Sequence, residues 1–349
     1  MTKVLVVATS RKTRGGITSV VKAHEMGKQW KEYHCKWIET HRDGPAWRKL
    51  WYLATALIEY VFLLPFYDIV HIHVGLMASV KRKLLFAKLA KLFHKKIIIH
   101  FHPSTEKHLF DKKYSVNIKE LFDFSDKLIV LSPQWVVWIN EAYPANQFDM
   151  TVVYNPCPIV KRDFSKRKKE VLYAGMLSDR KGYNRLLEAF SKLYDKYPDW
   201  KLVFAGNGEI DKARQLCIEL KIPADRVSFL GWVSGEKKVN AFQQASIYCL
   251  PSWGEGFPMG VLDALAYGIP VITTPVGGIE KVMHHSVDCM LFETFDIDAL
   301  SEALECLLKD ESLRNQIVKE ADKLVDTCFN IQYINTEIGE IYKNLLCQH

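Results

Sequence analysis

The chain has 349 residues, which is long enough for two domains that each bury a core, and its 48% hydrophobic and 25% charged residues exclude a disordered or fibrous class. The formal net charge of +7 is uneven, because residues 1–164 carry 25 Lys and Arg against 14 Asp and Glu, whereas residues 165–349 carry 22 against 26. The halves are therefore expected to face different partners, and the basic first half indicates an anionic surface such as phospholipid, a polyprenyl diphosphate or nucleic acid.

Eight cysteines are scattered without a CxxC pair or a Cys/His cluster at metal spacing, which indicates free thiols in a reducing cytosol. The chain starts directly on an apolar strand pattern and lacks the layout of a signal peptide. Its most apolar window, Trp51–Val70, is interrupted by Glu59, Pro65 and Asp68. No clean membrane span is therefore predicted.

The first half alternates buried-strand and helix patterns. A strand over Val4–Ala8 is followed by the glycines Gly15 and Gly16 and by a helix from about Ile17 to Gln29. Glycines at this place let the backbone approach a ligand closely, although an ordinary strand–helix turn is an alternative. The full GxGxxG spacing is missing, which argues against a nicotinamide-dependent oxidoreductase.

A basic helix is predicted after the third strand, Asp68–His73. Seven Lys and Arg lie between Lys81 and Lys96, no acid occurs from Ile69 to Thr105, and apolar residues recur at helical spacing. Either the helix packs on the sheet with its lysines merely solvated, or its basic face also meets a membrane or acceptor phosphates. The membrane- or acceptor-facing residues would be Lys81, Arg82, Lys83, Lys88, Lys91 and Lys95.

Two histidines close the strand over Ile97–His102. His100 and His102 share one face of this strand, because strand side chains alternate with a period of two, and His102 lies nearer to the following loop. A histidine at a strand end can orient a ligand or stabilise charge, or it can be a structural hydrogen-bonding group.

A charged segment poor in apolar residues, Val160–Lys169, predicts a linker, and the strand–helix pattern then starts again. The expected domains are residues 1–160 and 170–330, joined by the linker 161–169, with a last helical segment over 331–349. The fold class is therefore α/β with two Rossmann-like, doubly wound domains.

Arginine and lysine stand at a strand–helix junction early in the second domain. A strand ends at Ala174, the loop GMLSDRKG carries Arg180 and Lys181, and Tyr183 opens a helix. Cations at a helix N-terminus oppose the helix dipole, so an anion between them would relieve the conflict. The alternative is a solvated pair.

The stretch Pro251–Gly278, PSWGEGFPMGVLDALAYGIPVITTPVGG, is predicted to be a strand end, a loop, a helix and a second strand. Glu255 and Asp263 fall at the carboxyl edge of a parallel sheet, where such sheets bind ligands. Amides of Gly260, Val261 and Leu262 in the first helical turn could receive an anion. The alternative is that Glu255 caps the helix and Asp263 is a surface acid.

An acid, seven residues and an acid, within EGFP…DALAYGIPVI…GG, resemble glycosyltransferase family 4, retaining enzymes of the GT-B fold that use nucleotide sugars. The resemblance implies two domains facing a central cleft and a C-terminal helix that crosses back to the first domain. It implies that Glu255 contacts the donor sugar, Asp263 the ribose, and Arg180 with Lys181 the donor diphosphate. The first domain would face the acceptor or membrane. Asp263 replaces a commoner Glu, and Met176 replaces a common Arg.

The resemblance also implies the composition of the site. The catalytic residues would be Glu255, His102, Lys181 and Arg180. The donor-binding residues would be Gly15, Gly16, Gly175, Arg180, Lys181, Trp232, Val233, Glu255, Gly256, Phe257, Pro258, Met259, Gly260, Val261 and Asp263. No cofactor and no metal are expected, because no DxD-type motif accompanies the site and an arginine–lysine pair can replace a divalent ion.

The expected enzyme is a retaining, metal-independent hexosyltransferase. It would move a hexose or N-acetylhexosamine from a UDP-sugar, or another nucleotide-diphosphate sugar, to a saccharide carried on polyprenyl diphosphate. The pathway would be synthesis of a bacterial envelope polysaccharide such as lipopolysaccharide or capsule, on the cytoplasmic, inner face of the cell membrane, with no nucleic acid as partner. The alternatives are a catalytically silent nucleotide-sugar binder and a basic protein that binds membranes or nucleic acid.

Overall fold

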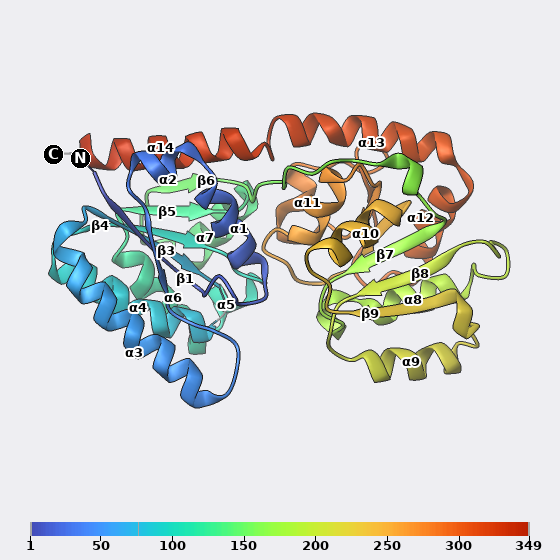
Figure 1. Cartoon of the computed structure of the whole chain (residues 1–349), viewed down its shortest axis with the longest axis horizontal. Coiled ribbons are helices and arrows are strands. Elements are labelled where there is room, and N and C mark those ends of the chain that lie inside the picture. The colour runs from blue at the N-terminus through green and yellow to red at the C-terminus, as the bar shows by residue number, and fades with distance from the viewer. Residues whose placement is uncertain (1, 76, 348–349) are drawn as a thin grey trace. The chain divides into compact units, whose positions relative to one another are not determined.

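The computed structural model describes residues 2–75 and 77–347 and divides the chain into two compact units (Figure 1). Unit 1 contains the chain up to Pro156 and again from Cys328 onward, and unit 2 is Cys157–Thr327. These limits lie close to the expected limits at residues 160 and 330. The C-terminal segment returns to unit 1, where the core includes Ile334 and Ile338 beside Val4 and Val6.

Unit 1 is built on a parallel six-stranded sheet in the order β2-β1-β3-β4-β5-β6. The strands are β1 (Val4–Ala8), β2 (Lys36–Glu39), β3 (Ile69–Val74), β4 (Lys96–Phe101), β5 (Lys127–Val130) and β6 (Met150–Val152). Every residue of β1 and β3 is buried, as expected for central strands covered on both faces. Because β1 lies between β2 and β3, the loops after β1 and β3 diverge at a switch point.

The helices of unit 1 cover this sheet. They are α1 (Gly16–Glu25), α2 (Lys28–Glu32), α3 (Ala46–Leu63), α4 (Met77–Leu92), α5 (Lys107–Phe110), α6 (Lys112–Asp123), α7 (Pro133–Ala142) and α14 (Ile331–Cys347). The single helix expected over Ile17–Gln29 is wrong, because the chain breaks at Gly27 into α1 and α2. The Gln29 side chain donates to the carbonyl of His24 at 3.0 Å and holds this break.

Unit 2 repeats the plan with a parallel six-stranded sheet in the order β12-β11-β10-β7-β8-β9. Its strands are β7 (Glu170–Ala174), β8 (Lys201–Ala205), β9 (Val227–Gly231), β10 (Ile247–Leu250), β11 (Val271–Thr273) and β12 (Met290–Leu291). Its helices are α8 (Tyr183–Ser191), α9 (Ile210–Glu219), α10 (Glu236–Gln244), α11 (Met259–Ala266), α12 (Ile297–Lys309) and α13 (Glu311–Asp326). The strand order reverses between β7 and β10, which are neighbours.

The segment expected to be a linker, 161–169, is bound to unit 2. Arg162 donates to the carbonyl of Ala266 at 2.8 Å and pairs with Asp322 at 2.6 Å. Arg167 donates to the carbonyls of Tyr267 and Gly268 at 2.6 and 3.1 Å. The two guanidinium groups thus satisfy carbonyls at the C-terminus of α11, where a helix favours cations. Two of the charged residues on which the linker prediction rested, Arg162 and Arg167, therefore have a structural role in unit 2.

Candidate functional site

A charged cluster lies where β7 and β10 end. Lys181 Nζ is 2.6 Å from Oε1 of Glu255, and Arg180 Nη1 is 3.2 Å from the same oxygen. Ser252 Oγ donates to that oxygen at 3.1 Å, and Glu255 is buried. Two cations face one carboxylate, so the cluster keeps a net charge of +1 at the switch point of the sheet. Three of the expected catalytic residues are therefore neighbours.

The backbone holds the loops of this cluster together. The N–H of Trp253 donates to the carbonyl of Arg180 at 2.9 Å, and the Trp253 indole donates to Asp179 at 3.1 Å. Gly182 has φ +77°, and a Cβ at this position would collide with the carbonyl oxygen of Pro251. Because glycine lets the loop after β7 pass this close to the end of β10, Lys181 can reach Glu255.

The second expected acid, Asp263, lies on α11 and has a partner that the sequence did not indicate. Lys238, on α10, places Nζ 2.7 Å from Asp263 Oδ2. Burial raises the pKa of Asp263, and the ammonium of Lys238 opposes that rise. The two residues are 25 positions apart, so no local pattern links them.

The first turn of α11 differs from the expected anion site. The N–H groups of Val261 and Leu262 lie 3.1 and 3.4 Å from the carbonyl of Pro258, to which both donate, and both residues are buried. The expectation that these two amides receive an anion is therefore wrong. Gly260 is half-buried, and a Cβ there would collide with the hydroxyl of Tyr248, so this glycine permits close packing on β10.

The other expected donor residues are spread over the ends of three strands. Gly175 directly follows β7, and Gly256, Phe257 and Pro258 are buried beyond β10, with Met259 half-buried at the start of α11. Trp232 and Val233 follow β9, where the backbone N–H of Trp232 donates to Asn207 Oδ1 at 2.8 Å. Asn207 sits in the GNGE loop after β8, and nothing in the sequence singled it out.

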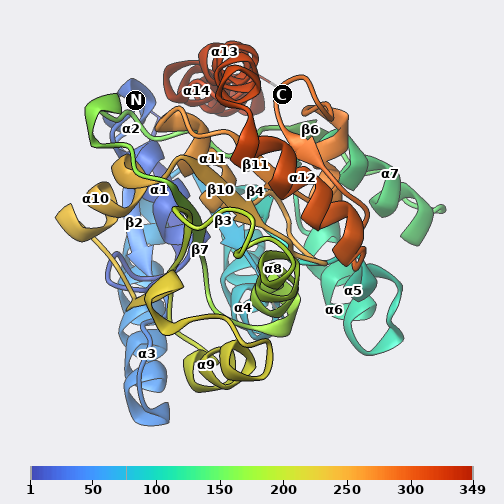
Figure 2. The ribbon, with the colours of Figure 1, turned by 90° about the vertical axis from the view of Figure 1, so that its right-hand side faces the viewer.

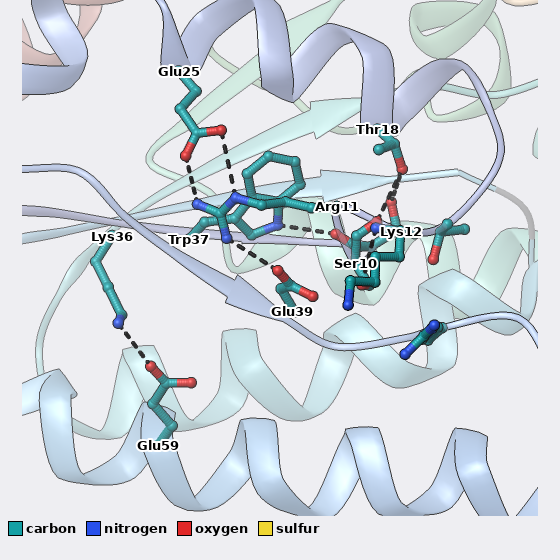
Figure 3. Close-up of polar contacts among 12 residues, drawn as sticks. Ser10, Arg11, Lys12, Thr18, Glu25, Lys36, Trp37, Glu39 and Glu59 are labelled. Atoms are coloured by element: carbon teal, nitrogen blue, oxygen red, sulfur yellow. Dashed lines mark hydrogen bonds and ion pairs between the residues drawn. The ribbon is translucent and has the colours of Figure 1, made fainter. Parts of the chain in front are cut away.

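The glycine loop of unit 1 is anchored by an arginine that the sequence analysis missed (Figure 3). Arg11 lies 2.5 Å from Glu25 and 3.0 Å from Glu39, and its guanidinium stacks 4.4 Å from the centre of the Trp37 ring. Gly15 has φ +147° and precedes α1, which begins at Gly16, and a Cβ on Gly15 would meet nothing within 4 Å. The contacts of Arg11 thus hold one end of the loop in place, whereas the space beside the Gly15 backbone is unfilled.

His102, after β4, belongs to a cluster of five histidines on one face of the unit 1 sheet. His102 Nε2 is 2.9 Å from His73 Nδ1, and the His100 and His102 rings stack with centroids 4.2 Å apart. His71 lies 3.3 Å from His100 and 2.7 Å from the hydroxyl of Tyr342 on α14. The remaining member, His24, lies 2.9 Å from Asn335.

Burial lowers the pKa of every member of this histidine cluster: to about 4 for His24, to about 3 for His102, and well below the ordinary value for His71, His73 and His100. Among the described residues, His71, His73 and His100 offer ligand atoms within 4.8 Å of one another and could share a metal ion. The His71 and His100 rings are nearly parallel, at 5°, and His71, His73 and His100 all lie within hydrogen-bonding distance of neighbouring side chains. This arrangement favours a stacked, hydrogen-bonded cluster of neutral imidazoles.

The expected basic face on α4 is only partly formed. Lys81, Lys88 and Lys91 are exposed, and Lys88 pairs with Glu120 at 2.7 Å. Lys83 is fully buried and donates to Thr40 Oγ1 at 2.8 Å, and burial lowers its pKa well below the ordinary lysine value. The expectation that Lys83 meets a membrane or acceptor is therefore wrong. Arg82 is half-buried, and Lys95 donates to the carbonyl of Pro65 at 3.3 Å.

Residues 159–324 match the family model described as Glycosyl transferases group 1. The match supports that family for unit 2. Among similar proteins, an uncharacterized glycosyltransferase of Methanocaldococcus jannaschii is 30% identical over 177 residues, which is 50% of this chain and 45% of that protein. Phosphatidyl-myo-inositol mannosyltransferase of Mycolicibacterium smegmatis is 25% identical over 286 residues, 80% of this chain and 72% of that protein. The chain spans about half the length of the first curated relatives it matches.

The fold is shared with solved structures. HepE of Anabaena, solved in complex with UDP and glucose, superposes with a TM-score of 0.80 at 17% identity, over 98% of this chain and all of that one. At this identity the likeness concerns the fold, and the two parallel six-stranded sheets are those of the GT-B architecture. The α/β, two-domain prediction is confirmed.

Proposed function

We propose that the chain is a glycosyltransferase that binds the diphosphate of a nucleotide sugar at the carboxyl ends of β7 and β10. The observation that carries the proposal is the contact of Lys181 and Arg180 with a buried Glu255 at the switch point of the unit 2 sheet. The family match of residues 159–324 supports glycosyl transfer as the reaction class.

The charges of this cluster suit the proposed chemistry. When the bond between sugar and diphosphate breaks, negative charge grows on the leaving phosphate, and preplaced cations lower that barrier. Lys181 and Arg180 would hold this phosphate, and Glu255 would accept hydrogen bonds from hydroxyls of the donor sugar. Asp263, paired with Lys238, would accept a hydrogen bond from the ribose. We assign His102 to the transferring sugar carbon, where a neutral imidazole can accept a hydrogen bond.

The donor and acceptor classes are part of the proposal. HepE of Anabaena, solved with UDP and glucose and also with UDP-glucose, supports a UDP-hexose donor. The mannosyltransferase of Mycolicibacterium smegmatis is named for a phospholipid, which supports an acceptor carried by a lipid. We infer a saccharide on polyprenyl diphosphate at the cytoplasmic face of a bacterial membrane, in envelope polysaccharide synthesis, and transfer with retention and without a metal ion.

Donor binding can be tested by thermal shift with UDP-, GDP- and ADP-sugars. A ligand present at 100 times its Kd should stabilise the wild type by about 2.7 kcal/mol. Lys181→Ala should weaken UDP-sugar binding roughly ten- to hundred-fold, because a hydrogen bond to a charged group contributes about 1.5–3 kcal/mol. Lys192→Ala, which removes an exposed lysine paired with Asp298, is the matched control and should bind as the wild type does. Equal binding by all three proteins would overturn the proposed site.

Measurement of sugar transfer distinguishes an enzyme from a protein that binds nucleotide sugars without catalysis. The expected result is release of UDP in the presence of a lipid-linked saccharide, retention of the anomeric configuration by NMR, and unchanged rates in EDTA. Loss of activity in EDTA that magnesium restores would exclude the metal-independent mechanism. Donor binding without turnover on any acceptor would favour the nucleotide-sugar-binding alternative.

A further inference from the structure

The outer side of α3 carries a continuous apolar stripe. It consists of Trp47, Leu50, Trp51, Ala54, Ile58, Val61 and Phe62, hereafter the α3 stripe. At about 100° per residue these positions fall within an arc of roughly 120°. Its large side chains are between 40% and 74% exposed, and Phe66 just beyond the helix is 68% exposed. An apolar surface on the order of 600 Å² results, which is at the upper limit for a soluble monomer.

The opposite side of α3 is firmly packed in unit 1. The Tyr60 ring meets Phe86 of α4 edge-on at 4.9 Å, and its hydroxyl donates to the carbonyl of Phe86 at 3.0 Å. Glu59, the only acid in the α3 sequence, pairs with Lys36 of β2 at 3.1 Å (Figure 3). The helix is therefore a fixed part of the domain, and its stripe is not the inner face of a displaced core helix.

Among the described residues, Ala46–Phe66 is the one helical segment long and apolar enough to cross a membrane, yet only 17% of its most apolar window is buried. Because its inner side is bonded to α4 and β2, the geometry favours a helix that lies in the plane of a membrane surface over one that spans it. In Figures 1 and 2, α3 runs beside α4 at the edge of unit 1.

The surroundings of the α3 stripe are basic. The guanidinium of Arg48 lies 5.5 Å from the centre of the Trp47 ring. At the other end, Lys95 of α4 donates to the carbonyl of Pro65. Lys81 and Lys91 of α4 add exposed positive charge. Apolar side chains with tryptophan, bordered by cations, match the headgroup region of an anionic bilayer. A second copy of the chain would bring these cations against one another.

We propose that the α3 stripe docks unit 1 on an anionic lipid bilayer, with its apolar side chains in the headgroup–acyl boundary. This assigns membrane contact to α3, whereas the sequence pattern pointed to α4, whose exposed lysines would supply only electrostatic attraction. The docking is independent of the transfer reaction, and only its purpose, delivery of the enzyme to a lipid-borne acceptor, rests on the proposed function.

The test is flotation of the full chain with vesicles of phosphatidylcholine alone and of phosphatidylcholine mixed with phosphatidylglycerol. The wild type should float with the anionic vesicles. Ile58→Glu should reduce its partition coefficient by about ten-fold or more, because a carboxylate replaces apolar contact in the boundary region. Ile218→Glu makes the same change on α9 of unit 2, where the isoleucine is 70% exposed against 60% for Ile58, and should leave flotation unchanged. Arg48→Gln with Lys81→Gln should weaken binding to anionic vesicles by roughly five-fold per cation removed.

UDP-sugar binding by thermal shift, measured on the same proteins, separates docking from the proposed function, since Ile58→Glu should keep it. Equal flotation of Ile58→Glu and Ile218→Glu would overturn the docking proposal whatever the donor result. A wild-type dimer that ignores vesicles and that Ile58→Glu dissociates in sedimentation velocity would also overturn it and assign the stripe to a second copy.

Discussion

At the scale of single residues, the contribution of the ion pair between Lys238 and the buried Asp263 to stability can be tested by substitution. Lys238→Met leaves the Asp263 carboxylate without its cation, and we expect the free energy of unfolding to fall by about 1–2 kcal/mol, a modest loss because the Lys238 side chain is 38% exposed and partly screened. Lys237→Met, one position away and exposed, should change it by less than about 0.5 kcal/mol. Urea unfolding measures both.

A double-mutant cycle completes this test. Because Asp263→Asn removes the charge that Lys238 neutralises, the two substitutions together should cost less than the sum of their separate effects, with a coupling above about 0.5 kcal/mol. Strictly additive effects would contradict a direct ion pair between these residues.

The residues of the unit 2 cluster differ in how far sequence could predict them. Glu255, Arg180 and Lys181 stand at strand–helix junctions, and a parallel sheet brings such junctions to one edge, so their proximity followed from the pattern. Lys238 and Asn207 reach the site from neighbouring loops and helices through tertiary packing alone. The first turn of α11 was misjudged because the Leu262 amide makes the ordinary i→i−4 bond to Pro258, and the same carbonyl also accepts from Val261, whose amide a helix end usually leaves open.

At the scale of elements, Gly182 controls how the start of α8 approaches the end of β10. Gly182→Ala meets both a left-handed backbone conformation, φ +77°, and a collision with the Pro251 carbonyl. Gly231 is the control, because it also has a positive φ, +65°, but an added Cβ would meet only Asn207 Oδ1 at 3.6 Å, an ordinary van der Waals distance. We expect Gly231→Ala to cost about 1 kcal/mol and Gly182→Ala about 2–4 kcal/mol, measured as the free energy of unfolding. Equal losses would mean that the close approach to Pro251 has no energetic consequence.

The helices show where periodicity fails as a predictor. It located α4, but it could not say which face of that helix is covered, because that depends on neighbours distant in sequence. Lys83 lies inside, beside Thr40 and the Phe86 ring, although lysine is among the residues least often buried. The α3 stripe lies on a helix that the sequence patterns did not predict, and it is exposed. The single helix expected over Ile17–Gln29 was wrong because the chain breaks at Gly27, after which a new helix begins.

At the scale of the whole molecule, the two units should differ in their response to acid. Unit 1 holds five histidines in their neutral form, of which His24, His71, His73 and His100 are buried and His102 is half-buried, whereas His284 and His285 of unit 2 are exposed. A buried histidine with a lowered pKa binds fewer protons folded than unfolded, so stability rises with pH in that interval. Its contribution is fully present above the unfolded pKa of about 6.5 and is lost as pH falls toward the folded value.

For His24, with a folded pKa of about 4, the loss between pH 6.5 and 5 is about 2 kcal/mol, since each pH unit in the interval contributes about 1.4 kcal/mol. Five such groups should destabilise unit 1 by several kcal/mol at pH 5, and unit 2 much less. Hydrogen-exchange mass spectrometry, corrected for intrinsic rates and run in EDTA, should show protection falling in β3 and β4 peptides but largely kept in β7 and β10. His24→Gln should flatten the dependence and His108→Gln, at a half-buried histidine of α5 outside the cluster, should not. A parallel loss of protection in both units would contradict the assignment of acid sensitivity to the histidine cluster, because only unit 1 buries these imidazoles.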